Sequence, residues 1–309
     1  MRTYTCYQVD AFTQKKFSGN PAGVVLDATG MQNEEMQQIA REFNNSETAF
    51  IFPSQNPDFD VRVRFFTPLS EVPICGHATI AAHFIRAITQ KPGHQRVYQK
   101  TNAGILPVDI VPEGNSYRIV MTQGAVEFGA ILSPDVLSTL YCALGITSAD
   151  IIPGLPIQII STGHSKIMVP LRNLSRLHSL QPNMDSLKNI SRQTGCNGFY
   201  AFTLDPDEDI PVHGRMFAPA IGIPEDPVTG NANGPLGAYL AHYRPKLINH
   251  GCLRFLARQG EAIGRSGDIL VEITVENDKP QKAQVSGKAV LVFQTEITLP
   301  DIPDSVQLR

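Results

Sequence analysis

Hydrophobic and polar residues alternate in many short stretches of the chain, and this alternation predicts β-strands. The predicted strands are Thr3–Phe12, Ala22–Leu26, Thr48–Phe52, Val61–Phe66, Tyr117–Met121, Ile157–Ser161, Val212–Phe217, Ile269–Val275 and Ala289–Thr298. The predicted helices are Asn33–Phe43 (with Asn33 as its N-cap), Thr79–Ala87, Pro134–Leu144, Met184–Thr194 and Pro235–Tyr243. Strands outnumber helices and are interleaved with them, so the sequence predicts an α+β fold.

Part of the sequence recurs after about half its length. The residues that recur 151 positions apart are Arg64, Phe66, Pro68 and Pro73, which match Arg215, Phe217, Pro219 and Pro224. Just upstream, SETAFIF from Ser46 corresponds to CNGFYAF from Cys196 at a spacing of 150. Chance similarity between β-rich stretches is the alternative, but in both halves a Gly-containing loop and a helix follow, which favours a duplication. We therefore expect two similar lobes related by a pseudo-two-fold axis.

Composition narrows the class of protein. Of 309 residues, 42% are hydrophobic and 18% are charged, which is typical of a folded globular protein. The net charge of −3 gives no basic face for nucleic acid or an anionic membrane. The apolar runs are far shorter than the ~20 residues that a membrane span needs. The five cysteines lie at least 54 residues apart, which fits neither a disulfide framework nor a zinc site, so we expect a cytoplasmic protein.

Two loops open helices in equivalent places of the two halves. Residues 75–79 (CGHAT) begin one predicted helix and residues 226–232 (DPVTGNA) precede the other. The free N–H groups of a helix N-terminus bind anions, and Gly76 and Gly230 would let a ligand approach the backbone. Either loop alone is best interpreted as an ordinary capped helix. As a pair related by the repeat, they predict a site for the carboxylate of a small-molecule substrate.

Candidate acid/base groups lie on the same segments. Glu47 directly precedes an apolar strand, where loss of solvent would raise the pKa of its carboxyl group towards the range useful for proton transfer. An exposed Glu at a strand end is the alternative. His77 is a candidate proton shuttle or a structural histidine, and Asp226 a candidate acid or a helix cap. Cys75 is a candidate reactive thiol or a small buried residue.

Other chemistries find no support in the sequence. It contains no Walker loop, no G-x-G-x-x-G after a strand, no G-x-S-x-G and no H-E-x-x-H. Cysteine and histidine do not cluster at metal-ligand spacing, and we interpret His164 and His213 as structural. We therefore expect neither a cofactor nor a metal.

Six segments of the chain resemble the PhzF family of phenazine-biosynthesis-like isomerases, and within it an uncharacterised bacterial branch. They are VDAFTQKKFSGNPAGVV from Val9, SETAF from Ser46, VRFFTPLSEVPICGHAT from Val63, GRMFAP from Gly214, EDPVTGNANGPLGAYL from Glu225 and RQGEAIGRSG from Arg258. The resemblance covers almost the whole chain. It implies a diaminopimelate-epimerase-like fold, in which two α+β lobes each wrap a curved sheet around a central helix and the active site lies between them.

The family resemblance also implies boundaries and an assembly. We expect an N-terminal lobe over residues 1–123, a second lobe over 124–287, and a C-terminal strand from about residue 288 to 309 that crosses back to the first lobe. A homodimer is expected by analogy and because most soluble oligomers are symmetric homo-oligomers.

Site residues follow from the same resemblance. The phenazine enzyme isomerises dihydro-hydroxyanthranilate without a cofactor, moving a proton and with it the double bonds. The family's catalytic Glu falls on Glu47, and its active-site His and Asp fall on His77 and Asp226. Gly76 and Gly230 fall on the glycines whose N–H groups hold the substrate carboxylate.

Two departures from the related enzymes bear on the substrate. Asn231 stands where the phenazine enzyme has a serine, and an amide can hydrogen-bond a ligand but cannot relay a proton as a hydroxyl can. Epimerases of the same fold use two facing thiols. Here Cys75 occupies the first thiol position, and the repeat spacing of 151 places Asp226 opposite it, which disfavours a symmetric two-thiol epimerase.

These observations lead to one hypothesis and two alternatives. We expect an isomerase that transfers a proton on a small carboxylated substrate, with Glu47 as general acid/base and His77 and Asp226 assisting. Ser46 and Cys75 join Gly76, Gly230 and Asn231 as the expected substrate-binding residues. The first alternative is a one-thiol racemase or epimerase that uses Cys75. The second is a carboxylate-binding protein without catalysis.

Overall fold

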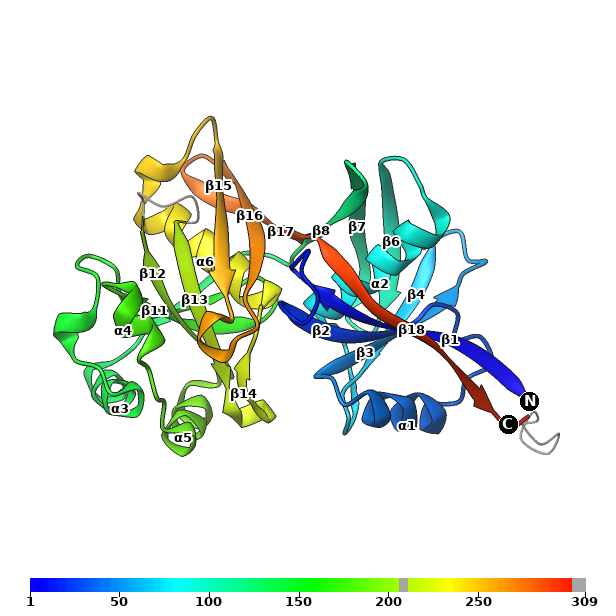
Figure 1. Cartoon of the computed structure of the whole chain (residues 1–309). Coiled ribbons are helices and arrows are strands. Elements are labelled where there is room, and N and C mark those ends of the chain that lie inside the picture. Colours follow the sequence, from blue (N-terminus) through cyan, green and yellow to red (C-terminus); the bar gives the residue numbers. More distant parts are fainter. Residues whose placement is uncertain (206–210, 302–309) are drawn as a thin grey trace.

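The computed structural model describes residues 1–205 and 211–301. The chain forms two lobes, and each is a curved mixed sheet with one long helix packed against it (Figure 1). This arrangement confirms the α+β class and the two similar lobes expected from the repeat.

The first lobe holds the N-terminal strands together with the last strand of the chain (Figure 1). Its strands are β1 (Arg2–Ala11), β2 (Asn20–Val25), β3 (Glu47–Pro53), β4 (Val61–Phe66), β5 (Glu71–Val72), β6 (Gln95–Thr101), β7 (Gly104–Glu113), β8 (Ser116–Thr122) and β18 (Ala289–Leu299). The strands of the second lobe are β9 (Glu127–Ile131), β10 (Gln158–Ser161), β11 (Ser165–Leu171), β12 (Phe199–Leu204), β13 (Val212–Ala218), β14 (Ile223–Asp226), β15 (Cys252–Gln259), β16 (Gly267–Glu276) and β17 (Lys279–Gly287).

The strand pairings repeat from lobe to lobe. In the first lobe β2 runs parallel to β3, β3 antiparallel to β4, and β4 parallel to β6. In the second lobe β11 runs parallel to β12, β12 antiparallel to β13, and β13 parallel to β15. The matched residues also make the same contact, because Arg64 lies 5.0 Å from the ring centre of Phe66 and Arg215 lies 5.0 Å from that of Phe217.

Two strands cross the boundary between the halves of the sequence. β9 follows the first-lobe strands but pairs with β10 of the second lobe. β18 follows the second-lobe strands but pairs with β1 from Arg2 to Ala11, which places the first and the last strand side by side in the first lobe (Figure 1). β8 pairs with β17 and joins the two sheets. These pairings support our proposal that the lobes divide near residues 123 and 288.

Each lobe packs its sheet against a largely buried helix. These two helices are α2 (Gly76–Gln90) and α6 (Gly230–Tyr243). The outer helices are α1 (Asn33–Phe43), α3 (Pro134–Leu144), α4 (Leu174–His178) and α5 (Met184–Thr194). Short 3₁₀ turns cover Ser148–Asp150, Pro219–Ile221, Pro245–Leu247 and Glu261–Ile263. An apolar core runs through both lobes and includes Ile80 of α2 and Leu236 of α6.

Three helix starts differ from the sequence prediction. α2 begins at Gly76 rather than Thr79, and α6 at Gly230 rather than Pro235. The prediction places the helix starts after these glycines, because glycine and proline are usual at helix ends. In the structure the first turns of both helices are buried and closely packed, and their small residues are part of the helix. The N-cap of α1 is Gln32 rather than Asn33, because Gln32 and Glu35 form a capping box.

Among residues 1–205 and 211–301, no helix combines the length and the apolar character that crossing a membrane requires.

Candidate active site

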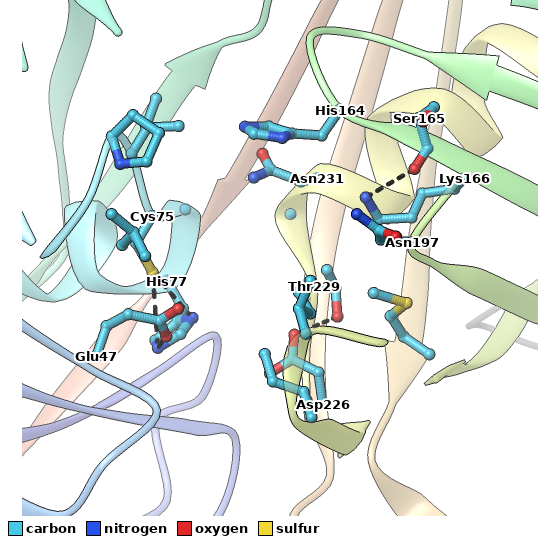
Figure 2. Close-up of a pocket in the computed structure, with 18 of the residues that line it drawn as sticks. Glu47, Cys75, His77, His164, Ser165, Lys166, Asn197, Asp226, Thr229 and Asn231 are labelled. Atoms are coloured by element: carbon cyan, nitrogen blue, oxygen red, sulfur yellow. Dashed lines mark hydrogen bonds and ion pairs between the residues drawn. The ribbon is translucent and has the colours of Figure 1, made fainter. Parts of the chain in front are cut away.

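A cavity of about 330 Å³ lies between the lobes, where the N-termini of α2 and α6 approach each other (Figure 2). Its first-lobe wall comes from the start of β3 and the segment that leads into α2. Its second-lobe wall comes from β11, β14 and the start of α6. The lining residues with polar side chains are Glu47, Cys75, His77, His164, Ser165, Lys166, Asn197, Asp226, Thr229 and Asn231.

The two helix N-termini meet at this cavity. A methyl group added at Gly76 would lie 3.9 Å from Cα of Gly230 and 3.8 Å from Oδ1 of Asn231. Nε2 of Gln123 donates a hydrogen bond of 2.8 Å to the carbonyl of Gly230 and so anchors the start of α6. Because the first N–H groups of a helix have no acceptor within it, two positive helix ends face one small space. This geometry suits a carboxylate.

Glu47 and His77 form a close pair on the first-lobe wall. Nε2 of His77 lies 3.3 Å from Oε2 of Glu47 and 3.2 Å from Oγ of Ser46. Oε2 of Glu47 is buried, and no described residue gives it a hydrogen bond of good geometry. Buried polar atoms without a partner are uncommon in folded proteins. Ser46, by contrast, contacts His77 but is not among the residues that line the cavity.

Cys75 is the N-cap of α2 and lies beside the same pair. Its Sγ is 3.5 Å from Nδ1 of His77. Burial, together with the negative charge of Glu47, raises the pKa of the Cys75 thiol well above its usual range. A thiolate is therefore disfavoured at this position, although a helix N-terminus usually favours one.

Asp226 lies on the opposite wall, at the end of β14. Its Oδ1 accepts a hydrogen bond of 2.9 Å from Nδ2 of Asn20, and its Oδ2 accepts one from the hydroxyl of Thr229. Burial raises the pKa of the Asp226 carboxyl group, against the opposing effects of His77 and of these hydrogen bonds. The protonated form of Asp226 is thus favoured more than in an exposed aspartate.

The pseudo-two-fold axis pairs unlike residues across the cavity. The spacing of 150 pairs Glu47 with Asn197, and both line the cavity. The helix starts, Gly76 and Gly230, are 154 residues apart, so His77 corresponds to Asn231. In these two pairs, the residue that can accept or release a proton lies in the first lobe, and its second-lobe counterpart is an amide.

The residue opposite Cys75 is not the one expected from the sequence. The N-cap of α6 is Thr229, so Thr229 rather than Asp226 corresponds to Cys75. The loop before α6 is three residues longer than the loop before α2, which makes the spacing of 151 invalid at the helix starts. The disfavoured two-thiol arrangement remains disfavoured, because threonine carries no thiol.

Sequence reasoning missed part of the second-lobe wall. His164 was interpreted as structural, but it lines the cavity, as do Ser165, Lys166 and Asn197 (Figure 2). Burial and the nearby Lys166 lower the pKa of His164. These residues belong to a hairpin and a strand start that carry no recognised motif, and the repeat spacing alone could have indicated Asn197. His213 lies outside the cavity, with its Nδ1 2.7 Å from Oε2 of Glu261.

One group of side chains on the first-lobe wall offers ligand atoms for a metal. One atom each from Glu47, Cys75 and His77 lies within 4.8 Å of the other two. Carboxylate, thiolate and imidazole are the donors that zinc uses. Cys75 would have to lose its proton first, which its raised pKa opposes.

Comparison with known proteins agrees with the geometry. The family described as phenazine biosynthesis-like protein matches residues 9–295 of the chain. The chain belongs to this family. An uncharacterized isomerase of Clostridium acetobutylicum is 54% identical over 97% of this chain and 99% of its own length. The uncharacterized isomerase YddE of Escherichia coli is 47% identical over 94% of this chain and 97% of its own length.

Solved structures give the same result for the fold. A PhzF-family phenazine biosynthesis protein from Bacillus anthracis superposes with a TM-score of 0.85 at 32% identity and covers 97% of this chain and 100% of its own. A hydroxyproline epimerase from Agrobacterium vitis superposes with a TM-score of 0.64 over 96% of this chain and 91% of its own; at 12% identity it shows the shared epimerase-like fold alone. The expected fold is thus confirmed.

A more distant relative has a named activity. The trans-2,3-dihydro-3-hydroxyanthranilate isomerase of Pseudomonas chlororaphis is 29% identical over 94% of this chain and 98% of its own length. The Clostridium, Escherichia and Pseudomonas relatives are all named as isomerases. The chain is an isomerase of the PhzF family. An enzyme is thus favoured over the binding-protein alternative.

Proposed function

We propose that this protein is a cofactor-independent isomerase that moves a proton within a small carboxylated substrate, with Glu47 as its general acid and base. The observation that carries the proposal is the buried Oε2 of Glu47 at the wall of the cavity, which lies 3.3 Å from Nε2 of His77 but receives no hydrogen bond of good geometry from the described residues. An oxygen in this position is free to take a proton from a carbon atom of a bound ligand. Water exclusion favours proton transfer between the two partners.

The helix N-termini supply the second half of the mechanism. A substrate carboxylate between the starts of α2 and α6 would accept hydrogen bonds from the N–H groups around Gly76 and Gly230. Removing a proton from a neighbouring or conjugated carbon spreads negative charge towards that carboxylate, and the positive helix ends stabilise the charge. The volume of about 330 Å³ is at the lower end for small-molecule sites.

The unlike walls favour proton transfer on one face of the substrate. Glu47 and His77 stand on the first-lobe wall, whereas the amides of their counterparts Asn197 and Asn231 cannot act as a general acid or base near neutral pH. Glu47 thus removes the proton and returns it to another carbon on the same face of the substrate. His77 holds the carboxylate group of Glu47 in place. Asp226 assists from the opposite wall, where burial raises the pKa of its carboxyl group.

Asn231 bears on which carboxylate is isomerised. The Pseudomonas relative is named for dihydro-hydroxyanthranilate, and the resemblance places a serine of the phenazine enzyme at this position. Because an amide cannot relay a proton, we propose a different cyclic or unsaturated carboxylate for this chain. We also infer a homodimer, on the base rate for soluble oligomers, and a cytoplasmic location, because all five cysteines are free.

Solvent isotope exchange tests the role of Glu47. The protein and its Glu47→Gln variant are incubated in heavy water with dihydro-hydroxyanthranilate and a panel of small cyclic and unsaturated carboxylates. We expect NMR to show deuterium entering a ligand with the wild type, and exchange slowed by about 10²-fold or more in Glu47→Gln. Line broadening should show that the variant still binds the ligand. The exposed Glu296→Gln serves as the matched control.

Two outcomes would contradict the proposal. Exchange at the wild-type rate in Glu47→Gln would show that Glu47 is not the general acid and base. Loss of exchange in Cys75→Ala, with Glu47→Gln active, would favour the one-thiol racemase instead. We expect Cys75→Ala to stay active, because the raised pKa of its thiol opposes formation of a nucleophile or base.

A further inference from the structure

Lys166 is a buried cation without an anionic partner among the described residues. It lies on β11, is 8% exposed and lines the cavity between the lobes. Its Nζ donates a hydrogen bond of 3.1 Å to the carbonyl of Ser165. Among residues 1–205 and 211–301, no carboxylate lies within 4.0 Å of Nζ. Figure 2 shows the side chain on the second-lobe wall, apart from Glu47, Cys75 and His77.

The neighbouring strand makes room for this side chain. A methyl group added at Gly198 would clash with Cδ of Lys166, so any larger residue there would displace the lysine. In the first lobe, β2 and β3 correspond to β11 and β12. There Gly23 of β2 pairs with Thr48 of β3, so the glycine lies on the strand that corresponds to the one carrying Lys166. A glycine thus occupies the place in the first lobe that corresponds to Lys166, so the buried lysine is particular to the second lobe.

The other charged groups among the described residues at the cavity form no ion pair with Lys166. Asp226 is engaged by Asn20 and Thr229, and Glu47 lies beside His77 on the opposite wall. Burial lowers the pKa of Lys166, against the smaller opposing effects of Cys196 and Asp226. A buried ammonium group of this kind gains most when an anion enters the cavity, because the anion replaces the solvation that the lysine has lost.

We propose that Lys166 binds a second anionic group of the substrate, so that the natural substrate carries two anionic groups: a carboxylate at the N-termini of α2 and α6, and a carboxylate or phosphate at Lys166. The inference rests on the proposed function for the first of these contacts. It makes Lys166 the residue that determines specificity between singly and doubly charged acids.

Ligand binding tests this assignment without any catalytic step. Succinate, glutarate and adipate are each compared with the monocarboxylate of equal chain length, which is butyrate, pentanoate or hexanoate, by calorimetry or NMR titration. We expect at least one dicarboxylate to bind the wild type about tenfold or more tightly than its partner. The preference should vanish in Lys166→Met, which keeps much of the length of the side chain and removes its charge. 3-Phosphonopropionate, compared with succinate, distinguishes a phosphate from a carboxylate as the second group.

The controls separate a lost contact from a lost fold. The exposed Lys246→Met should keep the full preference. Lys166→Met should show an unchanged or raised melting temperature, because replacing an unpaired buried charge by an apolar chain does not cost stability. If Lys166→Met unfolds, Lys166→Gln takes its place with the same expectation for binding.

Three results would overturn the inference: equal binding of the paired acids by the wild type, a preference retained in the folded Lys166 variant, or no binding of any probe at millimolar concentration. The first two leave the exchange experiment on Glu47 unaffected. A failure of the Glu47 experiment, in turn, leaves the Lys166 comparison intact, since that comparison measures binding alone.

Discussion

At the scale of single residues, burial has opposite consequences for the acid and the base that share the second-lobe wall. It raises the pKa of Asp226 and lowers the pKa of Lys166, so that each moves towards its neutral form. Both groups therefore cost the folded protein stability when they are charged. Side chains of this kind are retained where a ligand completes the site, which is the arrangement proposed for Lys166.

The raised pKa of Asp226 predicts how stability changes with pH. A carboxyl group whose pKa is higher in the folded state stabilises the protein below its ordinary pKa, and this contribution is lost as pH rises through the folded value. An asparagine in its place does not ionise, can still accept from Asn20 and can donate to Thr229. We therefore expect the melting temperature of Asp226→Asn, relative to wild type, to rise as the pH increases above the ordinary aspartate pKa of about 4. A difference that stays constant with pH in thermal unfolding would argue against a raised pKa.

At the scale of elements, the first turns of α2 and α6 combine helix formation with room for a ligand. Gly76 has a helical backbone and room for a methyl group, since the atoms nearest to an added methyl group lie at ordinary van der Waals contact distance. Gly234 is different, because a methyl group there would clash with Oε1 of Gln123. We therefore propose that Gly76 leaves room for the ligand, whereas Gly234 is required for packing against Gln123.

This difference predicts opposite effects of the same substitution. Gly76→Ala should fold normally, because alanine favours a helix by about 1 kcal/mol over glycine, but should weaken pentanoate or dicarboxylate binding by roughly tenfold. Gly234→Ala should lower the free energy of unfolding by about 1–3 kcal/mol, because Gln123 must move. Thermal unfolding and titration of both variants check this pair. Undiminished binding in Gly76→Ala would place the carboxylate elsewhere.

At the scale of the whole molecule, the first strand of the chain and the last one, β1 and β18, belong to the same sheet of the first lobe. β18 pairs with β1 along its full length, and Leu291, Ile297 and Leu299 pack against the apolar cores of the first lobe. The N-terminal amine also lies 2.5 Å from Asp301. The first lobe is therefore completed only by the last strand of the chain.

Removing that strand should damage the first lobe. We expect a chain truncated after Lys288 to lose soluble folded protein or to melt far below wild type, because β1 loses a paired neighbour and apolar side chains are uncovered. A chain truncated after Asp301 keeps all of β18 and is the control. Circular dichroism and thermal unfolding measure both. Native stability after the truncation at Lys288 would show that β18 is dispensable.

Local patterns in the sequence determined much of the architecture. Alternating residues located strands such as β4, which was predicted at its observed bounds, and the spacing of Arg64 and Arg215 revealed the duplication. Strands such as β6 and β17 were missed, because polar residues interrupt their alternation. The family resemblance led to Glu47, His77 and Asp226, and the structure brings all three to one cavity.

Only the tertiary structure decided what surrounds these residues. Glu47 lies at the start of β3, and Cys75 and His77 lie at the start of α2. These two elements meet because the helix packs against the sheet, and a short-range pattern carries no record of such packing. The longer loop before α6 placed Thr229 opposite Cys75, which no fixed spacing could show. In the sequence, nothing distinguishes Lys166 from an ordinary strand residue. Its burial, its lack of an anionic partner among the described residues and its place on the cavity wall depend on residues far away in the sequence that only the folded chain brings together.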